Sequence, residues 1–122
     1  MTEIFIDHTK SVIAIQVASQ SIHALGFEIT VFASDGNTKT EQFTGDTKVN
    51  NPFTKTLTIN PPESKGAYIR GTFTVMSADG KDDPFRVVLS ILENGFPVKP
   101  NITLSGNTTK GQATSIATFH IN

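Results

Sequence analysis

The stretch from Phe85 to Val98 restricts the fold of this 122-residue chain more than any other, because it predicts a complete β-hairpin. Apolar side chains occupy every second position of its first arm, which is the period of a strand with one buried face. These positions are Phe85, Val87, Leu89 and Ile91. Asn94 and Gly95 then supply two residues that adopt positive φ, as the turn of a two-residue type I′ hairpin requires.

Two prolines lie in the returning arm of this hairpin and limit how it pairs. The turn sets a register in which Ile91 faces Val98 and Leu89 faces Pro100. Proline has no backbone N–H to donate, so Pro97 and Pro100 indicate that the returning arm is an edge strand. The same reasoning predicts that the pairing ends at Pro100.

Strand-like alternation of apolar and polar residues recurs along most of the chain. Clear examples are Leu25 to Ala33, Ala67 to Met76 and Ala113 to Ile121. The segment from Ser11 to Ser19 is apolar on both faces, which predicts a strand in the centre of a sheet. Residues 38–55 are polar and rich in turn formers, and they read as an edge region or a functional loop with at most a short strand around residues 42–44.

About eight short strands separated by turn signals indicate an all-β protein. No segment offers a crossover helix, which argues against parallel βαβ units. We therefore predict a single domain over residues 1–122, folded as an antiparallel β-sandwich of Greek-key or jelly-roll type. A chain of this length buries about two-thirds of the surface of its unfolded form without disulfides.

Two pairs of segments resemble each other at nearly constant spacing. Ile29–Gly36 (ITVFASDG) matches Phe73–Gly80 (FTVMSADG), and Pro52–Gly66 matches Pro97–Gly111. One interpretation is the duplication of a four-strand unit, which would give the sandwich approximate internal two-fold symmetry. The other is that threonine-rich strands joined by Asp-Gly and Lys-Gly turns resemble each other without a common origin.

The composition argues against most enzyme chemistry. The chain has no cysteine, which excludes disulfides, cysteine nucleophiles and iron–sulfur clusters. Its three histidines, His8, His23 and His120, have no partner at metal-ligand spacing, and no serine lies in a G-x-S-x-G motif. The net charge is −1 and the basic residues are scattered, so a nucleic-acid partner is not expected. The protein is therefore expected not to be an enzyme.

No targeting or membrane-spanning segment is recognisable in the chain as given. Met1 to Glu3 lead directly into the apolar run Ile4 to Ile6, without the basic start of a signal peptide. No apolar run approaches the length of a transmembrane helix. We expect a soluble protein that is cytoplasmic, exported by an unconventional route, or the mature form of a secreted protein.

The tightest acidic cluster comprises Asp79, Asp82 and Asp83. Carboxylate oxygens that converge on one loop suit Ca²⁺, so these three residues are the candidate metal ligands; the alternative is a solvated turn. The order S-x-D-G-x-D-D resembles the calcium loop of the bacterial two-calcium fucose-binding lectins. That family carries further acidic and asparagine ligands where this chain has Pro84 to Arg86, so membership is not inferred.

A non-catalytic binding module for carbohydrate or a cell surface is the function expected of such a domain, by analogy of fold. The predicted ligand face combines the three aspartates of the acidic loop with the polar turn residues Asp35, Asn37 and Asn94. The chain has no tryptophan, and Tyr68 and Phe32 are among the few aromatic residues expected to face outward. The alternative is a structural subunit that forms a homo-oligomer through its sheet faces or edges, as the low charged fraction of 17% suggests.

Overall fold

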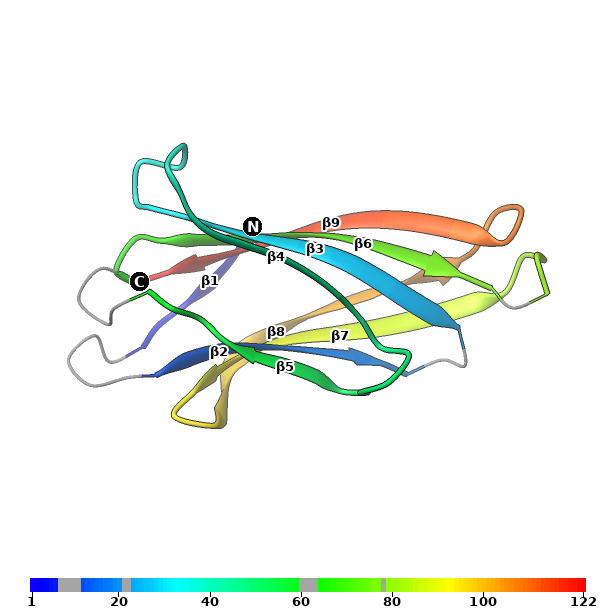
Figure 1. Cartoon of the computed structure of the whole chain (residues 1–122), viewed down its shortest axis with the longest axis horizontal. Helices are drawn as coiled ribbons and strands as arrows, with labels where there is room; N and C mark the ends of the chain where they lie inside the picture. The colour runs from blue at the N-terminus through cyan, green and yellow to red at the C-terminus, as the bar shows by residue number, and fades with distance from the viewer. Residues whose placement is uncertain (7–11, 21–22, 60–63, 78) are drawn as a thin grey trace.

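The computed structural model describes residues 1–6, 12–20, 23–59, 64–77 and 79–122. Two β-sheets pack face to face (Figure 1), which confirms the predicted all-β sandwich. Sheet A has the strand order β1-β9-β6-β3-β4, and sheet B has the order β5-β2-β7-β8. The strands are β1 (Thr2–Ile4), β2 (Ile13–Ser19), β3 (Ala24–Phe32), β4 (Lys39–Asp46), β5 (Phe53–Thr56), β6 (Tyr68–Met76), β7 (Pro84–Glu93), β8 (Phe96–Asn107) and β9 (Gln112–Ile121).

The core lies between the sheets and is built from the alternating apolar positions of both. Its largest fully buried side chains come from β1, β2, β3, β6, β7 and β9, and they include Phe73, Phe119, Ile15, Leu25 and Ile91. The β2 strand lies inside sheet B between β5 and β7, which confirms the central position predicted from its apolar faces. The part of the chain that the structure describes has no helix long and apolar enough to cross a membrane.

The predicted hairpin joins β7 to β8. Asn94 and Gly95 have φ values of 51° and 86°, and Ile91 pairs with Val98 as expected. Leu89, however, pairs with Ile102, so the prediction that it faces Pro100 is wrong.

The expectation that the ladder ends at Pro100 is also wrong, because a bulge interrupts the pairing and β8 then continues. Between the pairs Ile91–Val98 and Leu89–Ile102, β7 has one residue and β8 has three. Pro100 is one of these three β8 residues, so it lies in the bulge and outside the regular ladder. Its missing N–H therefore leaves no ladder hydrogen bond unmade. The predicted edge position of β8 is confirmed.

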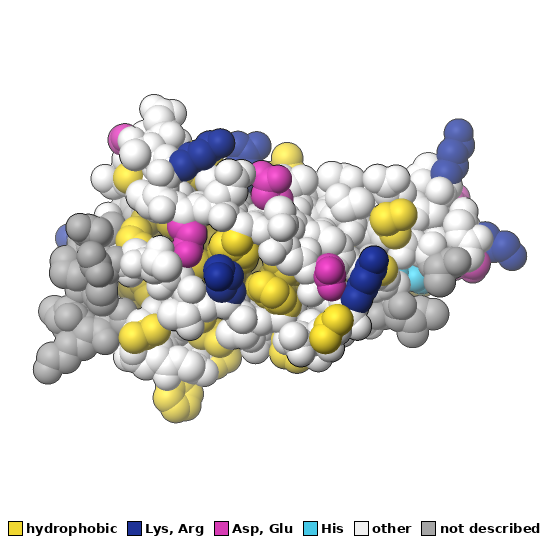
Figure 2. Space-filling view, in the orientation of Figure 1, with side chains coloured by type: hydrophobic (Ala, Val, Ile, Leu, Met, Phe, Trp, Pro, Cys, Tyr) yellow, Lys and Arg dark blue, Asp and Glu magenta, His cyan; other side chains and the backbone are white. Residues whose placement is uncertain are grey.

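Residues 38–55 contain a longer strand than predicted. The eight-residue β4 forms the edge of sheet A, which confirms the interpretation as an edge region. Its inward side chains are half-buried against β5: the rings of Phe43 and Phe53 are 6.5 Å apart, and Nζ of Lys55 lies 5.2 Å from the Phe43 ring centre. Figure 2 shows hydrophobic side chains at the surface between these two edge strands.

The N-terminal strand differs from the predicted antiparallel arrangement. The β1 strand is parallel to β9 and pairs only with residues Phe119 to Ile121. The repeated segments lie in comparable places, because β3 and β6 are inside sheet A and β5 and β8 are the edges of sheet B, but the strands that connect them differ. The strand after β3 is β4, in the same sheet, whereas the strand after β6 is β7, in the opposite sheet.

Candidate functional site

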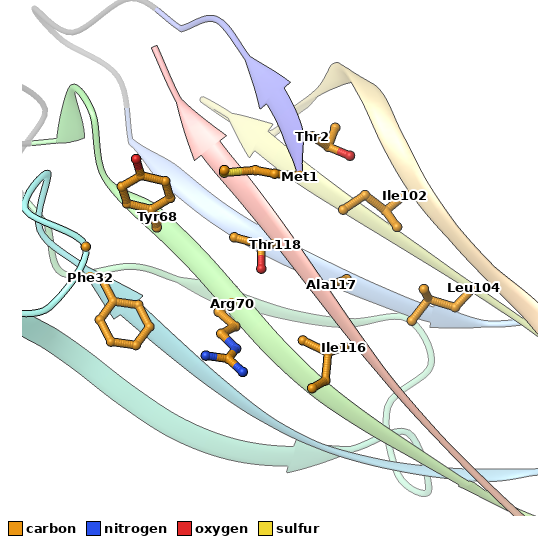
Figure 3. Close-up of a pocket in the computed structure, with 11 residues that line it drawn as sticks. Met1, Thr2, Phe32, Tyr68, Arg70, Ile102, Leu104, Ile116, Ala117 and Thr118 are labelled. Atoms are coloured by element: carbon orange, nitrogen blue, oxygen red, sulfur yellow. The ribbon is translucent and has the colours of Figure 1, made fainter.

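A groove of about 560 Å³ crosses β9 from the outer face of sheet A to the apolar side chains between the sheets, close to the end where β3 finishes and β6 begins (Figure 3). On one side of β9, Phe32, Tyr68 and Arg70 line the groove, and we call these three residues the aromatic half. At β9 and beyond it lie Ala117, Ile102 and Leu104, which we call the apolar half. Strands from both sheets therefore build the groove.

The aromatic half arises from the register of three neighbouring strands. Phe32 of β3 and His120 of β9 are the direct cross-strand partners of Tyr68 in β6. Arg70 follows two residues after Tyr68, so it projects from the same face of the sheet. The rings of Tyr68 and His120 stack with centroids 4.4 Å apart and an angle of 15° between their planes. This stacking fixes the Tyr68 ring at the rim of the groove.

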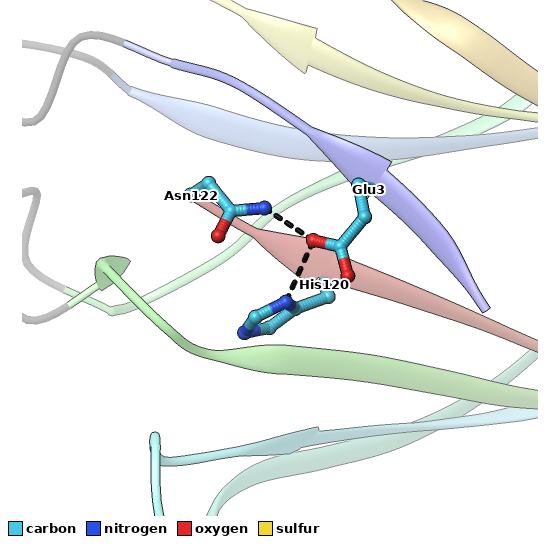
Figure 4. Close-up of polar contacts among 3 residues, drawn as sticks. All are labelled: Glu3, His120 and Asn122. Carbon is cyan, nitrogen blue, oxygen red and sulfur yellow. Dashed lines mark hydrogen bonds and ion pairs between the residues drawn. The ribbon is translucent and has the colours of Figure 1, made fainter.

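His120 is itself held by residues near the two chain ends (Figure 4). Its Nδ1 lies 2.7 Å from Oε2 of Glu3, and the side-chain amide of Asn122 donates to the same oxygen. The hydrogen bond from Asn122 and the contact with His120 lower the pKa of Glu3 below its usual value. Glu3 and Asn122 thus position Tyr68 through His120.

A second hollow of about 250 Å³ adjoins the aromatic half, because Phe32 and Arg70 line both. Its other lining side chains are mostly polar and come from β3, β4 and β6. They include Glu28, Lys39, Gln42 and Thr72. The Gln42 side-chain amide donates to the Glu28 carboxylate at 2.6 Å. The outer face of sheet A therefore carries hydrogen-bonding groups on both sides of Arg70.

The turn between β3 and β4 contains the predicted ligand residues Asp35 and Asn37. It borders the main groove of about 560 Å³ through Gly36. The Asp35 carboxylate accepts hydrogen bonds from the backbone N–H groups of Asn37 and Thr38, each at 2.8 Å. It also accepts a hydrogen bond from the Thr38 hydroxyl at 2.5 Å. Because these bonds stay within the turn, Asp35 stabilises the turn that places Gly36 at the rim of the groove.

The pKa of Asp35 provides a direct check of this turn. The Thr38 hydroxyl, followed by the N–H groups of Thr38 and Asn37, lowers this pKa below its usual value. The stabilisation is therefore present above the ordinary carboxyl pKa and is lost as the pH falls through the lowered value. We expect Thr38→Val to raise the pKa of Asp35 in an NMR titration of its carboxyl carbon. The same pKa in both proteins would contradict the described geometry.

The acidic loop lies at the opposite end of the sandwich from this groove (Figure 1). Asp79 accepts the N–H of Lys81 at 2.9 Å, and Asp82 accepts the N–H of Lys110 at 2.8 Å. A hydrogen bond with Asp79 raises the pKa of Asp83, whereas the Lys81 N–H lowers that of Asp79. Among the described residues, no group of three acidic or histidine side chains is arranged to hold a metal ion. The described contacts of Asp79 and Asp82 are thus hydrogen bonds to backbone N–H groups of the turns at this end.

Asn94 lies in the β7–β8 turn, where its side-chain oxygen accepts the N–H of Val12 at 2.9 Å. The predicted ligand residues therefore occupy three separate places, and only the turn containing Asp35 and Asn37 borders the main groove.

Sequence reasoning identified Tyr68 as an outward aromatic residue but did not associate it with Arg70 or His120 as a site. The only available signal was their outward position in the alternation of two strands distant in sequence. Comparison with known proteins gives no independent assignment: no family model, curated protein or solved structure matches the chain.

Proposed function

We propose that this protein is a non-catalytic binding module that holds a carbohydrate on the outer face of sheet A. The observation that carries the proposal is the aromatic half of the groove, where two rings from neighbouring strands lie beside the guanidinium group of Arg70 (Figure 3). The site is built on three paired strands, and such sites hold their side chains more rigidly than loops do.

The chemistry of the site suits a sugar. A pyranose ring has an apolar face of C–H groups, which packs on an aromatic ring, and a rim of hydroxyl groups that need hydrogen-bond partners. Phe32 and Tyr68 supply the aromatic surface, and Arg70 supplies several N–H donors in a planar arrangement. Glu28 and Gln42, in the adjoining hollow, add acceptors and donors within reach of an extended ligand.

The alternative is a structural homo-oligomer in which the same face packs against another copy. Ile116, which is 57% exposed beside the groove, favours this alternative. Light scattering separates the two proposals, because a carbohydrate-binding module needs no second copy for its site. A stable dimer that is lost in Ile116→Ser, together with no carbohydrate binding, would favour the oligomer.

The test of carbohydrate binding compares two arginines. Arg70→Ala is expected to weaken binding at least about tenfold, a loss of about 1.4 kcal/mol, measured by calorimetry on glycans selected from an array. The matched control is Arg86→Ala, which removes an exposed arginine from β7 in the other sheet. Phe32→Ala should have an effect like that of Arg70→Ala. Equal affinities of Arg70→Ala and wild type, or no binding of any glycan, would refute the proposal.

A further inference from the structure

We propose that the unpaired part of the β9 edge binds an extended strand from a partner polypeptide, with apolar side chains at alternate positions. This strand would lie in line with β1 and complete sheet A over the apolar half of the groove. The inference concerns the far side of β9 from the aromatic half, so it does not rest on carbohydrate binding.

Every second residue of β9 directs its backbone N–H and C=O groups toward this edge. The N–H of Asn122 donates to Ile4, and the N–H of Ile6 donates to Asn122, so even-numbered residues face the β1 side. The register with β6 has no irregularity, and the same direction therefore applies to Thr114, Ile116 and Thr118. Within the described ranges, β1 pairs on this side as far as the residue opposite Phe119, and Thr109 of the β8–β9 turn pairs with Gln112 at the other end.

The other sheet edges carry features that discourage added strands, and this part of β9 does not. The β4 edge has Lys39 and Asp46, the four-residue β5 has Lys55, and β8 has two prolines and a bulge. Charged side chains, prolines, bulges and short length are the usual protections of an edge. The segment Ala113–Thr118 is uncharged, contains no proline and pairs regularly with β6.

Beneath this edge lies an apolar surface that needs a cover. Ile102 and Leu104 of β8 are half-buried and line the groove with Ala117 (Figure 3). Ile4 of β1 occupies an inward position along the same edge of β9, and its side chain is completely buried. A strand that continues this line would bury its own alternate side chains over Ile102 and Leu104, as in β-strand addition to an exposed edge.

A partner strand fits this space better than a second copy of β9. Antiparallel pairing of β9 with itself would direct Ala113, Ser115 and Ala117 inward, since these positions face the core. Such small side chains would leave much of Ile102 and Leu104 uncovered. Valine, isoleucine or leucine at alternate positions would cover them, which is why we assign the edge to an apolar strand of another chain.

The first experiment measures binding of a fluorescent nine-residue peptide that alternates valine with threonine and ends in lysine on both sides. Anisotropy is expected to show binding below about 1 mM. Ile116→Pro removes an N–H that faces the free edge and leaves the β6 ladder intact, so it should weaken binding at least about tenfold. The control Ile116→Thr keeps this N–H and should bind within about threefold of wild type. Absence of binding, or equal binding by both variants, would overturn the proposal.

The second experiment joins a seven-residue segment directly before Met1. Ile4 and Thr2 pair with the inward residues Ile121 and Phe119, so the next inward position lies opposite Ala117, one residue before Met1. Valine there and at every second residue upstream should raise the melting temperature by about 4 °C or more and block the peptide. The same segment shifted by one residue should do neither.

Two outcomes of this second experiment count against a partner strand. Equal melting temperatures of the in-phase and shifted fusions would overturn the proposal, because the edge would then show no preference for inward apolar side chains. A concentration-dependent dimer of the unfused protein that Ile116→Pro abolishes would also overturn it, because the occupant would then be a second copy.

Discussion

Gly71→Val is expected to lower the free energy of unfolding by about 3 kcal/mol, the upper part of the usual range for overpacking a core. Gly71 faces the core from the middle of β6, and the Phe73 ring lies directly against it. A Cβ at Gly71 would overlap two carbon atoms of that ring and lie 2.9 Å from Cδ1 of Ile29. Both side chains are almost completely buried, so neither moves aside without disturbing its neighbours.

The matched control is Gly26→Ala in the adjacent strand β3, where an added Cβ meets no atom within 4 Å. We expect the control to change stability by less than about 0.5 kcal/mol, and Gly71→Val to lower the melting temperature by about 12 °C. In a double-mutant cycle, Phe73→Leu should reduce the cost of the change at Gly71, because it removes the overlapping ring atoms. Equal stability of the two glycine variants would show that Phe73 does not pack over Gly71.

Gly111→Ala is the second substitution with a large expected effect, a loss of about 3 kcal/mol of unfolding free energy from two causes. Gly111 has a φ of +81°, and a side chain in this left-handed region costs about 1–2 kcal/mol. An added Cβ would also lie 2.7 Å from the Cα atom of Gly80. Because that atom belongs to the backbone of the β6–β7 turn, the two turns would have to separate.

Gly80→Ala isolates the second cause, since Gly80 also has a positive φ of 71° but an added Cβ there meets nothing within 4 Å. Chemical denaturation should give a loss of about 1 kcal/mol for Gly80→Ala and at least twice that for Gly111→Ala. Equal losses would mean that the contact between the two turns contributes nothing. The experiment thus measures how tightly the acidic loop is joined to the β8–β9 turn.

The local features of the fold were predictable from the sequence, and the failures occur where pairing over longer distances decides. The Asn94-Gly95 turn determines its own neighbouring pairs, so Ile91 and Val98 were placed correctly. The continuation of β8 past Pro100 was missed because a bulge depends on the whole length of β7 beside it. The position of β4 was recognised only as an edge, because its inward side chains are partly polar and show a weak alternation.

The similarity between the repeated segments has a physical explanation in the turns. The matched glycines Gly36 and Gly80 have φ values of 73° and 71°, and Gly66 and Gly111 have values of 80° and 81°. Each pair therefore satisfies the same left-handed turn requirement, which glycine meets most easily. The different sheet positions of β4 and β7 argue against a symmetric duplication of a whole four-strand unit, and the shared turn requirement accounts for the matched glycines.

The groove was beyond sequence reasoning for a different reason. Phe32, Tyr68 and His120 come from three strands far apart in the chain, and only the register between β3, β6 and β9 brings them together. Polar turn residues attracted attention instead, because turns commonly carry binding residues. In the structure, Asp35, Asp79 and Asp82 accept hydrogen bonds from nearby backbone N–H groups.

Amide NMR titration with the glycans selected from the array tests the central claim most directly, because it reports both whether a carbohydrate binds and where. Carbohydrate binding on the outer face of sheet A predicts saturable shifts of the amides of Phe32, Tyr68, Arg70 and Thr118, with the acidic loop at the other end unaffected. Shifts confined to residues 79–83 or to the β7–β8 turn, or no shifts with any glycan, would contradict it.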